Sequence, residues 1–190
     1  MFIHRMRQRR SKSRTSAAES RDSRLSPDEI RARAFQHAVK LLAAKPRSIA
    51  ELRDRLAERC SSKTVVETVI SRLREYGYLD DERYALTYAS SKVRQQPIGR
   101  RRLELSLRKK KVDRAVADEA LNQVFAETSE GDLIDRAIEK RVRLRGHPKT
   151  RAEAKSLFDH LLRQGFPFEL VADKVRAAAK TDLEDVESST

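Results

Sequence analysis

Apolar residues recur at helical spacing through most of this chain, and the segments that separate them are short. The first periodic segment opens with SPDEI. Ser26 is a good N-cap residue, the following proline suits a first helical turn, and the two acids lie near the positive end of the helix dipole. The pattern predicts a helix from there to about Ala44.

Two further helices complete the first unit. Ser48 follows the breaker KPR and, with Glu51 three residues later, has the sequence of a capping box. A third helix is predicted from about Thr64 to Gly77, where glycine permits the left-handed conformation that ends helices. We therefore expect a three-helix unit.

The apolar pattern then repeats. The positions that share it are Ala34, Ala38, Leu42, Pro46, Leu52, Leu56, Val65 and Ile70, and 51 residues later stand Ala85, Ala89, Val93, Pro97, Leu103, Leu107, Val116 and Leu121. A looser third copy has Leu157, Leu161, Leu170 and Val175, with a first helix near Asp132 to Arg143. Self-similarity at a fixed period predicts tandem modules, each of which covers the apolar face of its neighbour.

The predicted fold is therefore all-α, an elongated, curved array of three tandem three-helix repeats. The expected divisions are a disordered basic arm over 1–25, repeats over 26–79, 80–126 and 127–180, and a disordered acidic tail over 181–190. An Arg- and Ser-rich start also suits an organelle transit peptide, which stays an alternative for the arm.

Charge narrows the function. With 42 Lys and Arg against 29 Asp and Glu, the chain carries +13, which favours a polyanion as partner. A single cysteine, Cys60, excludes an intramolecular disulfide framework, and no apolar run is long enough to span a bilayer. We expect a monomeric protein of the cytoplasm with no membrane partner.

Catalytic and metal signatures are weak. Asp80, Asp81 and Glu82 are consecutive, whereas ligands for a hard cation are spread through a loop, so these acids suit a helix start better. The four histidines have no metal-binding spacing, and no glycine-rich phosphate loop or nucleophile elbow occurs. We expect no enzyme activity, no cofactor and no metal.

Two basic clusters are the strongest functional signal. Residues 92–111 hold nine Lys or Arg against one Glu, and helical spacing puts Arg101, Arg108 and Lys109 opposite the apolar Leu103 and Leu107. The second cluster consists of Lys140, Arg141, Arg143, Arg145, Lys149 and Arg151. The candidate binding residues are Lys92, Arg94, Arg100, Arg101, Arg102, Arg108, Lys109, Lys110, Lys111, Lys140, Arg141, Arg143 and Arg145. No RNP-like aromatic pattern accompanies them, so phosphate contact without sequence reading is favoured.

A second functional class stays open. Residues 48–79 also have the order of a helix-turn-helix or winged-helix transcription regulator. A wing needs a strand hairpin, however, and the next residues, DDERYALTYASSKV, have helical spacing. A purely structural helical adaptor for proteins is the third class.

The segment EYGYLDDERYA is predicted to join the first two modules. Gly77 would end one helix, Asp80 would cap the next, and Leu79 with Tyr84 has the spacing of a hydrophobic staple. The expected joint residues are Gly77, Tyr78, Leu79, Asp80, Asp81 and Tyr84.

Four stretches together resemble the RecX family, the bacterial regulators of the RecA recombinase. They are RSIAELRDRL, GYLDDERYA, IGRRRLELSLRKKKVD and LLRQGF, and the resemblance covers about residues 30 to 178. The chain departs from the family at Lys110, Lys111 and Val112, where members often have Lys-Gly-Ile. The basic arm lies outside the resemblance.

The resemblance implies a protein that lies in the helical groove of the RecA filament on single-stranded DNA. It implies inhibition of ATP hydrolysis, strand exchange and co-protease activity, and hence a role in recombination, DNA repair and the SOS response. Our hypothesis is that the basic clusters contact acidic RecA surface and the DNA backbone.

Overall fold

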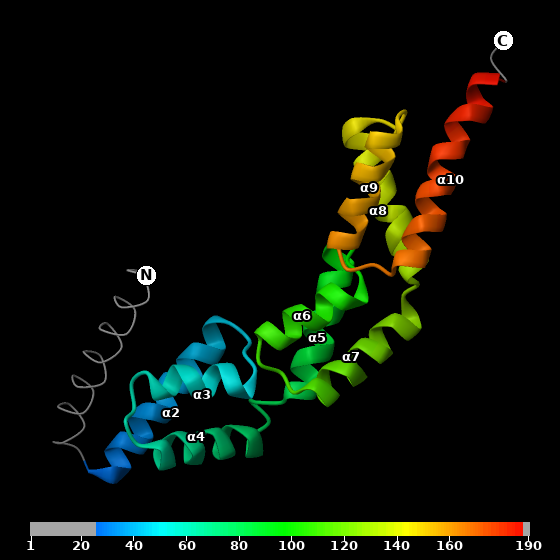
Figure 1. Ribbon diagram of the computed structural model, residues 1–190. Helices are drawn as coiled ribbons and strands as arrows, with labels where there is room; N and C mark the ends of the chain where they lie inside the picture. Colours follow the sequence, from blue (N-terminus) through cyan, green and yellow to red (C-terminus); the bar gives the residue numbers. More distant parts are fainter. Residues whose placement is uncertain (1–25, 188–190) are drawn as a thin grey trace, which may run out of the picture. The chain divides into compact units, whose positions relative to one another are not determined.

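The computed structural model describes residues 26–187, with side chains described through residue 178 (Figure 1). Within that range the chain forms nine helices and no strand, which confirms the all-α prediction. They are α2 (Pro27–Ala44), α3 (Ile49–Ala57), α4 (Lys63–Glu75), α5 (Asp81–Gln95), α6 (Arg100–Lys109), α7 (Arg114–Glu127), α8 (Glu130–Arg145), α9 (Arg151–Arg163) and α10 (Phe168–Glu187). The predicted arm over 1–25 lies outside the described residues. In the part of the chain that is described, no helix combines the length and apolar character needed to cross a bilayer.

The helices form two compact units. Unit 1 contains α2, α3, α4, the start of α5 through Tyr84, and the separate turn Lys110–Val112. Unit 2 contains the rest of α5 from Ala85, then α6 through α10. Each unit buries its own set of apolar side chains.

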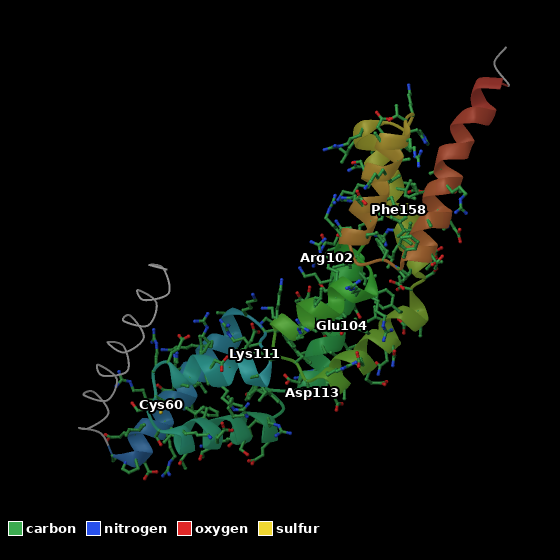
Figure 2. The ribbon with its side chains drawn as sticks, viewed as in Figure 1. Cys60, Arg102, Glu104, Lys111, Asp113 and Phe158 are labelled. Carbon is green, nitrogen blue, oxygen red and sulfur yellow. The ribbon has the colours of Figure 1, made fainter. Side chains whose placement is uncertain are left out.

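Unit 1 is a three-helix core. In Figure 1, α2, α3 and α4 lie together, and their facing residues are nearly all apolar. The buried set is Ala34, Ala38, Leu52, Leu56, Cys60, Val66, Val69, Ile70, Leu73 and Leu79. Cys60 (labelled in Figure 2) is thus a core residue and not an exposed thiol. An Arg53–Glu67 ion pair at 2.7 Å joins α3 to α4 at the rim of this core.

The helix caps of unit 1 agree with the sequence in one case and differ in the other. At Ser26 a full capping box with Glu29 is present. At Ser48 only half of the predicted box forms, because Glu51 donates its main-chain N–H to Ser48 Oγ at 3.1 Å but directs its carboxylate to Lys110, at 3.0 Å. The distant lysine therefore replaces the reciprocal capping bond.

Unit 2 repeats the buried register of unit 1. Eight of the ten residues that stand 51 positions after the unit 1 core set are buried, among them Ala85, Ala89, Leu103, Leu107 and Leu121; the exceptions are the exposed Lys111 and the half-buried Glu130. Further buried residues come from α8, α9 and α10, which pack together in Figure 1, and from the turn between α9 and α10; they are Leu133, Ile134, Ala137, Ile138, Leu157, Leu161, Phe166, Val171 and Val175. The tandem pattern thus corresponds to real packing.

Two expectations for the third repeat are wrong. Leu170 is 39% exposed and its neighbour Val171 is fully buried, because α10 begins at Phe168 in a phase that turns residue 171 inward. A tail was also expected from residue 181, but α10 continues to Glu187. That segment has no glycine or proline to stop a helix, and Leu183 and Val186 continue the helical spacing.

Corresponding turns follow the second helix of two successive repeats. Lys111 after α6 and Gly165 after α9 stand 54 positions apart, and both have positive φ, 56° and 89°. Lys111 is the only non-glycine residue with positive φ in the described chain. An L-residue other than glycine is strained there, because its Cβ crowds the backbone.

Main-chain groups meet directly beside these turns. In unit 2, Gly99 donates its N–H to the Gln164 carbonyl at 3.0 Å, and Arg101 donates to the Gly165 carbonyl at 3.3 Å. A Cβ on Gly99 would lie 2.3 Å from the Gly165 backbone, so only glycine fits. In unit 1 the corresponding residue is Ser48, whose hydroxyl donates to the Lys110 carbonyl.

We predict that Lys111→Gly is more stable than Lys111→Ala by about 1 kcal/mol, because both variants lose the Lys111–Asp54 ion pair but only glycine relieves the left-handed strain. Urea unfolding of the two variants checks this. Equal midpoints and slopes for glycine and alanine would contradict it.

We predict that Gly99→Ala destabilises unit 2 by about 3 kcal/mol, because the new methyl group would overlap the Gly165 backbone. Gly131→Ala is the matched control, since its Cβ would meet only side-chain atoms, the Ser129 hydroxyl at 3.3 Å and Lys174 Cε at 3.9 Å. Amide hydrogen exchange in α6 and α9, together with thermal unfolding, reports the difference. Similar protection in both variants would show that the close approach is dispensable.

Candidate functional site

The acids of residues 80–82 begin α5. Asp80 accepts the Arg83 main-chain N–H at 2.9 Å, so it is the N-cap, and Arg83 donates from its side chain to the Gly77 carbonyl at 2.7 Å. Gly77 lies in the turn that follows α4, and its φ of 70° is in the left-handed region. Leu79, two residues later, is buried. These contacts give Asp80 a structural task.

Asp81 reaches a different helix. Its carboxylate accepts the Ile49 main-chain N–H at 2.9 Å and so caps the N-terminus of α3. Burial raises the pKa of Asp81, and the hydrogen bond from Ile49 opposes that rise. Glu130 likewise caps a helix in unit 2, because its carboxylate accepts the Arg100 main-chain N–H at 2.9 Å at the start of α6. In the described residues no group of three His, Cys, Asp or Glu side chains could hold a metal ion.

Aromatic residues near the end of α4 form a small surface cluster. Tyr76 makes edge contacts with Phe35 and with Tyr78, at 6.3 and 6.4 Å between ring centroids. The Arg72 guanidinium lies over the rings of Phe35 and Tyr76. Tyr84 is half-buried, as is Tyr88, whose ring lies 5.7 Å from Lys92 Nζ. These rings pack on neighbours, with Tyr78 the most exposed at 62%.

The exposed face of α6 carries unpaired cations. Leu103 and Leu107 are fully buried, whereas Arg101, Arg108 and Lys109 on the other side are exposed. In the described structure none of these three cations has an ion-pair partner within the chain. The exposed Arg94, at the end of α5, is likewise unpaired. This face is therefore free to meet an anion.

Several other candidate cations are already engaged within the protein. In unit 1, Lys110 pairs with Glu51 at 3.0 Å and Lys111 pairs with Asp54. In unit 2, Arg100 donates to Asn122 at 2.7 Å, Arg102 to Gln164 at 2.6 Å and Arg141 to Ser156 at 2.9 Å. Figure 2 shows Arg102 close to α9. Binding by these residues would first have to share or break such contacts.

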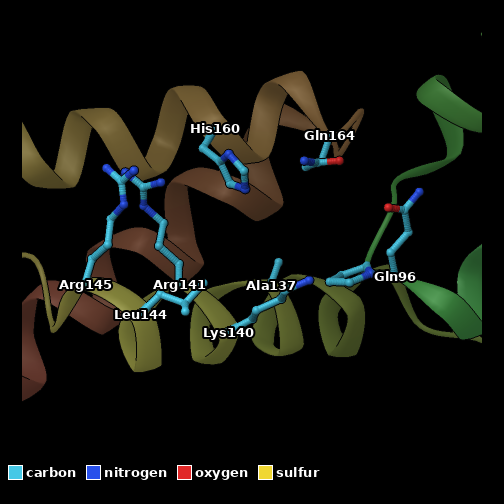
Figure 3. A pocket seen from close by; sticks show the side chains of 9 residues that line it. Gln96, Ala137, Lys140, Arg141, Leu144, Arg145, His160 and Gln164 are labelled. Atoms are coloured by element: carbon cyan, nitrogen blue, oxygen red, sulfur yellow. The ribbon is translucent and has the colours of Figure 1, made fainter.

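The second basic cluster lines a cleft in unit 2. Figure 3 shows Arg141 and Arg145 extending from α8 toward α9, from which His160 points into the space between the helices. The cleft has a volume of about 260 Å³. Its lining consists of Gln96, Pro97, Ala137, Lys140, Arg141, Leu144, Arg145, His160 and Gln164, without an acidic residue. The exposed Arg143 of α8 lies outside the lining.

His160 is the electrostatic centre of this cleft. Burial lowers its pKa first, and the charges of the surrounding arginines lower it further; they are Arg141, Arg163, Arg102 and Arg145. Arg102 of the first basic cluster and Arg141 and Arg145 of the second therefore act electrostatically on the same imidazole. Sequence reasoning missed His160, Arg163 and Gln164, because it tested the histidines only for metal-ligand spacing.

The structure excludes the winged-helix alternative for residues 48–79. A wing would require two strands after Gly77, but the chain enters α5 at Asp81, and residues 26–187 contain no strand. The acids at 80–82 start a helix there, as capping by Asp80 shows.

Comparison with known proteins gives a single family. The RecX first three-helix domain matches residues 34–73, and the RecX second three-helix domain matches residues 80–121. Regulatory protein RecX of Thermobifida fusca is 30% identical over 179 residues, covering 90% of this chain and 94% of that protein. The same-named protein of Treponema pallidum is 37% identical over 110 residues, covering 58% of this chain and 66% of that protein.

Solved structures agree on the fold. RecX from Lactobacillus salivarius has a TM-score of 0.70 at 19% identity, covering 81% of this chain and 99% of that one. A second structure, of regulatory protein RecX, has a TM-score of 0.67 at 22% identity, covering 78% of this chain and 72% of that one. The chain therefore belongs to the RecX family of regulatory proteins.

Proposed function

We propose that this protein regulates a RecA recombinase by binding the filament that RecA forms on single-stranded DNA, in the filament's helical groove. Binding would inhibit ATP hydrolysis, strand exchange and co-protease activity, and so modulate recombination, DNA repair and the SOS response. The protein would act without chemistry or a cofactor of its own, as a monomer in the cytoplasm where such filaments form.

The observation that carries this proposal is the display of unpaired cations on unit 2. Arg101, Arg108 and Lys109 on α6, with Lys140 and Arg145 on α8, have no carboxylate partner among the described side chains. Leaving this many charges unneutralised costs self-repulsion, which a polyanionic partner would relieve. A nucleoprotein filament presents phosphates and acidic protein surface together, so both components would contribute.

The engaged cations have a different role in this proposal. Lys110 and Lys111 hold the turn after α6 against α3 through Glu51 and Asp54. Their removal should therefore act on stability before it acts on binding. The residues proposed to contact the filament are therefore the exposed cations without an ion pair, Arg101, Arg108 and Lys109, together with the basic residues that line the cleft.

Wild-type protein is expected to inhibit RecA ATP hydrolysis on single-stranded DNA, and the triple variant Arg101→Glu, Arg108→Glu, Lys109→Glu should need about tenfold more protein for half-inhibition. Each exposed charge is worth about 0.2–1 kcal/mol, so three reversals supply roughly the 1.4 kcal/mol that a tenfold change requires. A coupled ATPase assay measures the effect.

The control is the variant Arg33→Glu, Lys40→Glu, Lys63→Glu, which makes the same charge change at exposed positions of α2 and α4. It should inhibit like wild type. Absence of inhibition by the wild-type protein at stoichiometric amounts would overturn the proposed function. An equal loss of inhibition in both triple variants would instead show that the effect comes from net charge and not from the position of the α6 cations.

Binding to single-stranded DNA alone should weaken as salt rises, with log affinity falling by about 0.7 per decade for each phosphate contacted. The α6 triple variant should therefore show a smaller slope than wild type, by up to about 2 if all three cations contact phosphates. Fluorescence anisotropy of a labelled oligothymidylate at several salt concentrations gives the slopes. Identical slopes would remove α6 from the DNA contact, and a preference for one duplex sequence would favour the transcription-regulator class.

A further inference from the structure

We propose that the cleft between α8 and α9 binds a backbone phosphate of single-stranded nucleic acid, and that His160 makes this binding proton-linked. The inference rests on the proposed function, since it names the point on unit 2 where the nucleic acid would be held. It adds a site and a regulation that the family resemblance does not contain.

The lining of the cleft has the chemistry of a phosphate site. Lys140, Arg141 and Arg145 supply positive charge from α8, and no carboxylate lines the space to neutralise them. Arg141 uses one guanidinium nitrogen on Ser156 at 2.9 Å, which orients the group and leaves its other donors available. Guanidinium groups recognise phosphate oxygens through paired, charge-assisted hydrogen bonds.

The remaining lining suits a nucleotide chain. Leu144, which is 74% exposed, and Pro97 both line the cleft, so apolar surface is available for a sugar or base. Gln96 and Gln164 add neutral polar groups. A volume of about 260 Å³ lies below the range of about 300–1,000 Å³ that is usual for free small molecules, and it fits one segment of a chain that continues outside.

Arg102 supports the cleft from α6. Its guanidinium donates to the Gln164 side chain at 2.6 Å and to the Arg163 carbonyl at 3.3 Å. These bonds fix the last turn of α9, from which His160 and Gln164 face the cleft. Arg102 therefore positions the site and also adds charge beside it.

The charges around His160 make its protonation depend on the ligand. The charges that act on it are the guanidinium groups of Arg141 and Arg145 on α8, Arg163 on α9 and Arg102 on α6. They disfavour a proton on the imidazole while the cleft has no anion. A phosphate would offset their charge, so a proton on His160 would then be favourable, and binding would take up a proton.

We predict that wild-type affinity for oligothymidylate rises several-fold, up to about tenfold, between about pH 7.5 and about pH 5.8, since a pKa rise of one unit on binding corresponds to a tenfold change. The phosphodiester itself does not titrate in this range. In His160→Gln the rise should disappear, because glutamine keeps a polar side chain but cannot take up the proton.

His37→Gln is the matched control. His37 is half-buried beside Arg59 and Lys40 in unit 1, and its pKa is lowered by burial and then by those charges, but it lies outside the cleft. This variant should keep the wild-type pH dependence. Circular dichroism and melting temperature establish that both variants are folded.

Nuclear magnetic resonance titration of the wild-type histidine ring protons tests the same inference without a substitution. The pKa of His160 should rise when oligothymidylate is added, while that of His37 stays fixed. Inorganic phosphate and a polyglutamate peptide are the comparison ligands; a nucleic-acid site predicts that neither matches oligothymidylate in raising the pKa of His160.

The outcomes separate this inference from the proposed function. RecA inhibition with pH-independent oligothymidylate binding, or with an unchanged His160 pKa, would overturn the cleft inference and leave the proposed function standing. Proton-linked oligothymidylate binding without RecA inhibition would overturn the proposed function and support the cleft inference. A larger pKa shift with polyglutamate than with oligothymidylate would assign the cleft to acidic protein surface and overturn the nucleic-acid inference.

Discussion

The main-chain contact between the start of α6 and the turn after α9 is the constraint on which the helix arrangement of unit 2 depends. Gly99 and Gly165 approach so closely that a methyl group on either would overlap the other backbone or Arg102. Buried main-chain groups must be paired, and a direct bond between two backbones leaves no room for a side chain. At the corresponding place in unit 1, the fully buried Ser48 side chain makes the contact. Its hydroxyl donates to the Lys110 carbonyl and accepts the Glu51 main-chain N–H.

Acidic residues at helix starts complete this framework. Asp81 caps α3 and Glu130 caps α6, and each comes from the first helix of the repeat that follows. Carboxylates are well suited to this role, because helix N-termini offer unpaired N–H groups and positive potential. The chain therefore uses part of its smaller acidic complement internally, and Arg101, Arg108 and Lys109 of α6 have no ion-pair partner among the described residues. The same distribution of charge that caps helices within each unit also leaves the exposed cations on which the proposed function rests.

Much of the fold was accessible from the sequence, since apolar period and capping residues are local signals. The shift of 51 positions from Ala34 to Ala85, or from Leu52 to Leu103, matched buried residues because both repeats bury the same helix faces. Leu170 failed because the phase of α10 is set by where the chain leaves the Gly165 turn, which is a tertiary feature. The cleft was not predictable either, since it needs α6, α8 and α9 in place before Arg102 and Arg145 meet at His160.

Positions that differ between repeats carry the features that distinguish this chain. Ser106 stands 54 positions before His160, and it donates its hydroxyl to the Arg102 carbonyl of its own helix at 2.8 Å. His160 directs a titratable ring into a cleft instead. Similarly, Lys111 occupies the strained position where the next repeat has Gly165, and gains an ion pair with Asp54. The shared positions of the repeats serve packing and capping, so features that belong to one repeat, such as the His160 cleft, lie where the equivalent residues differ.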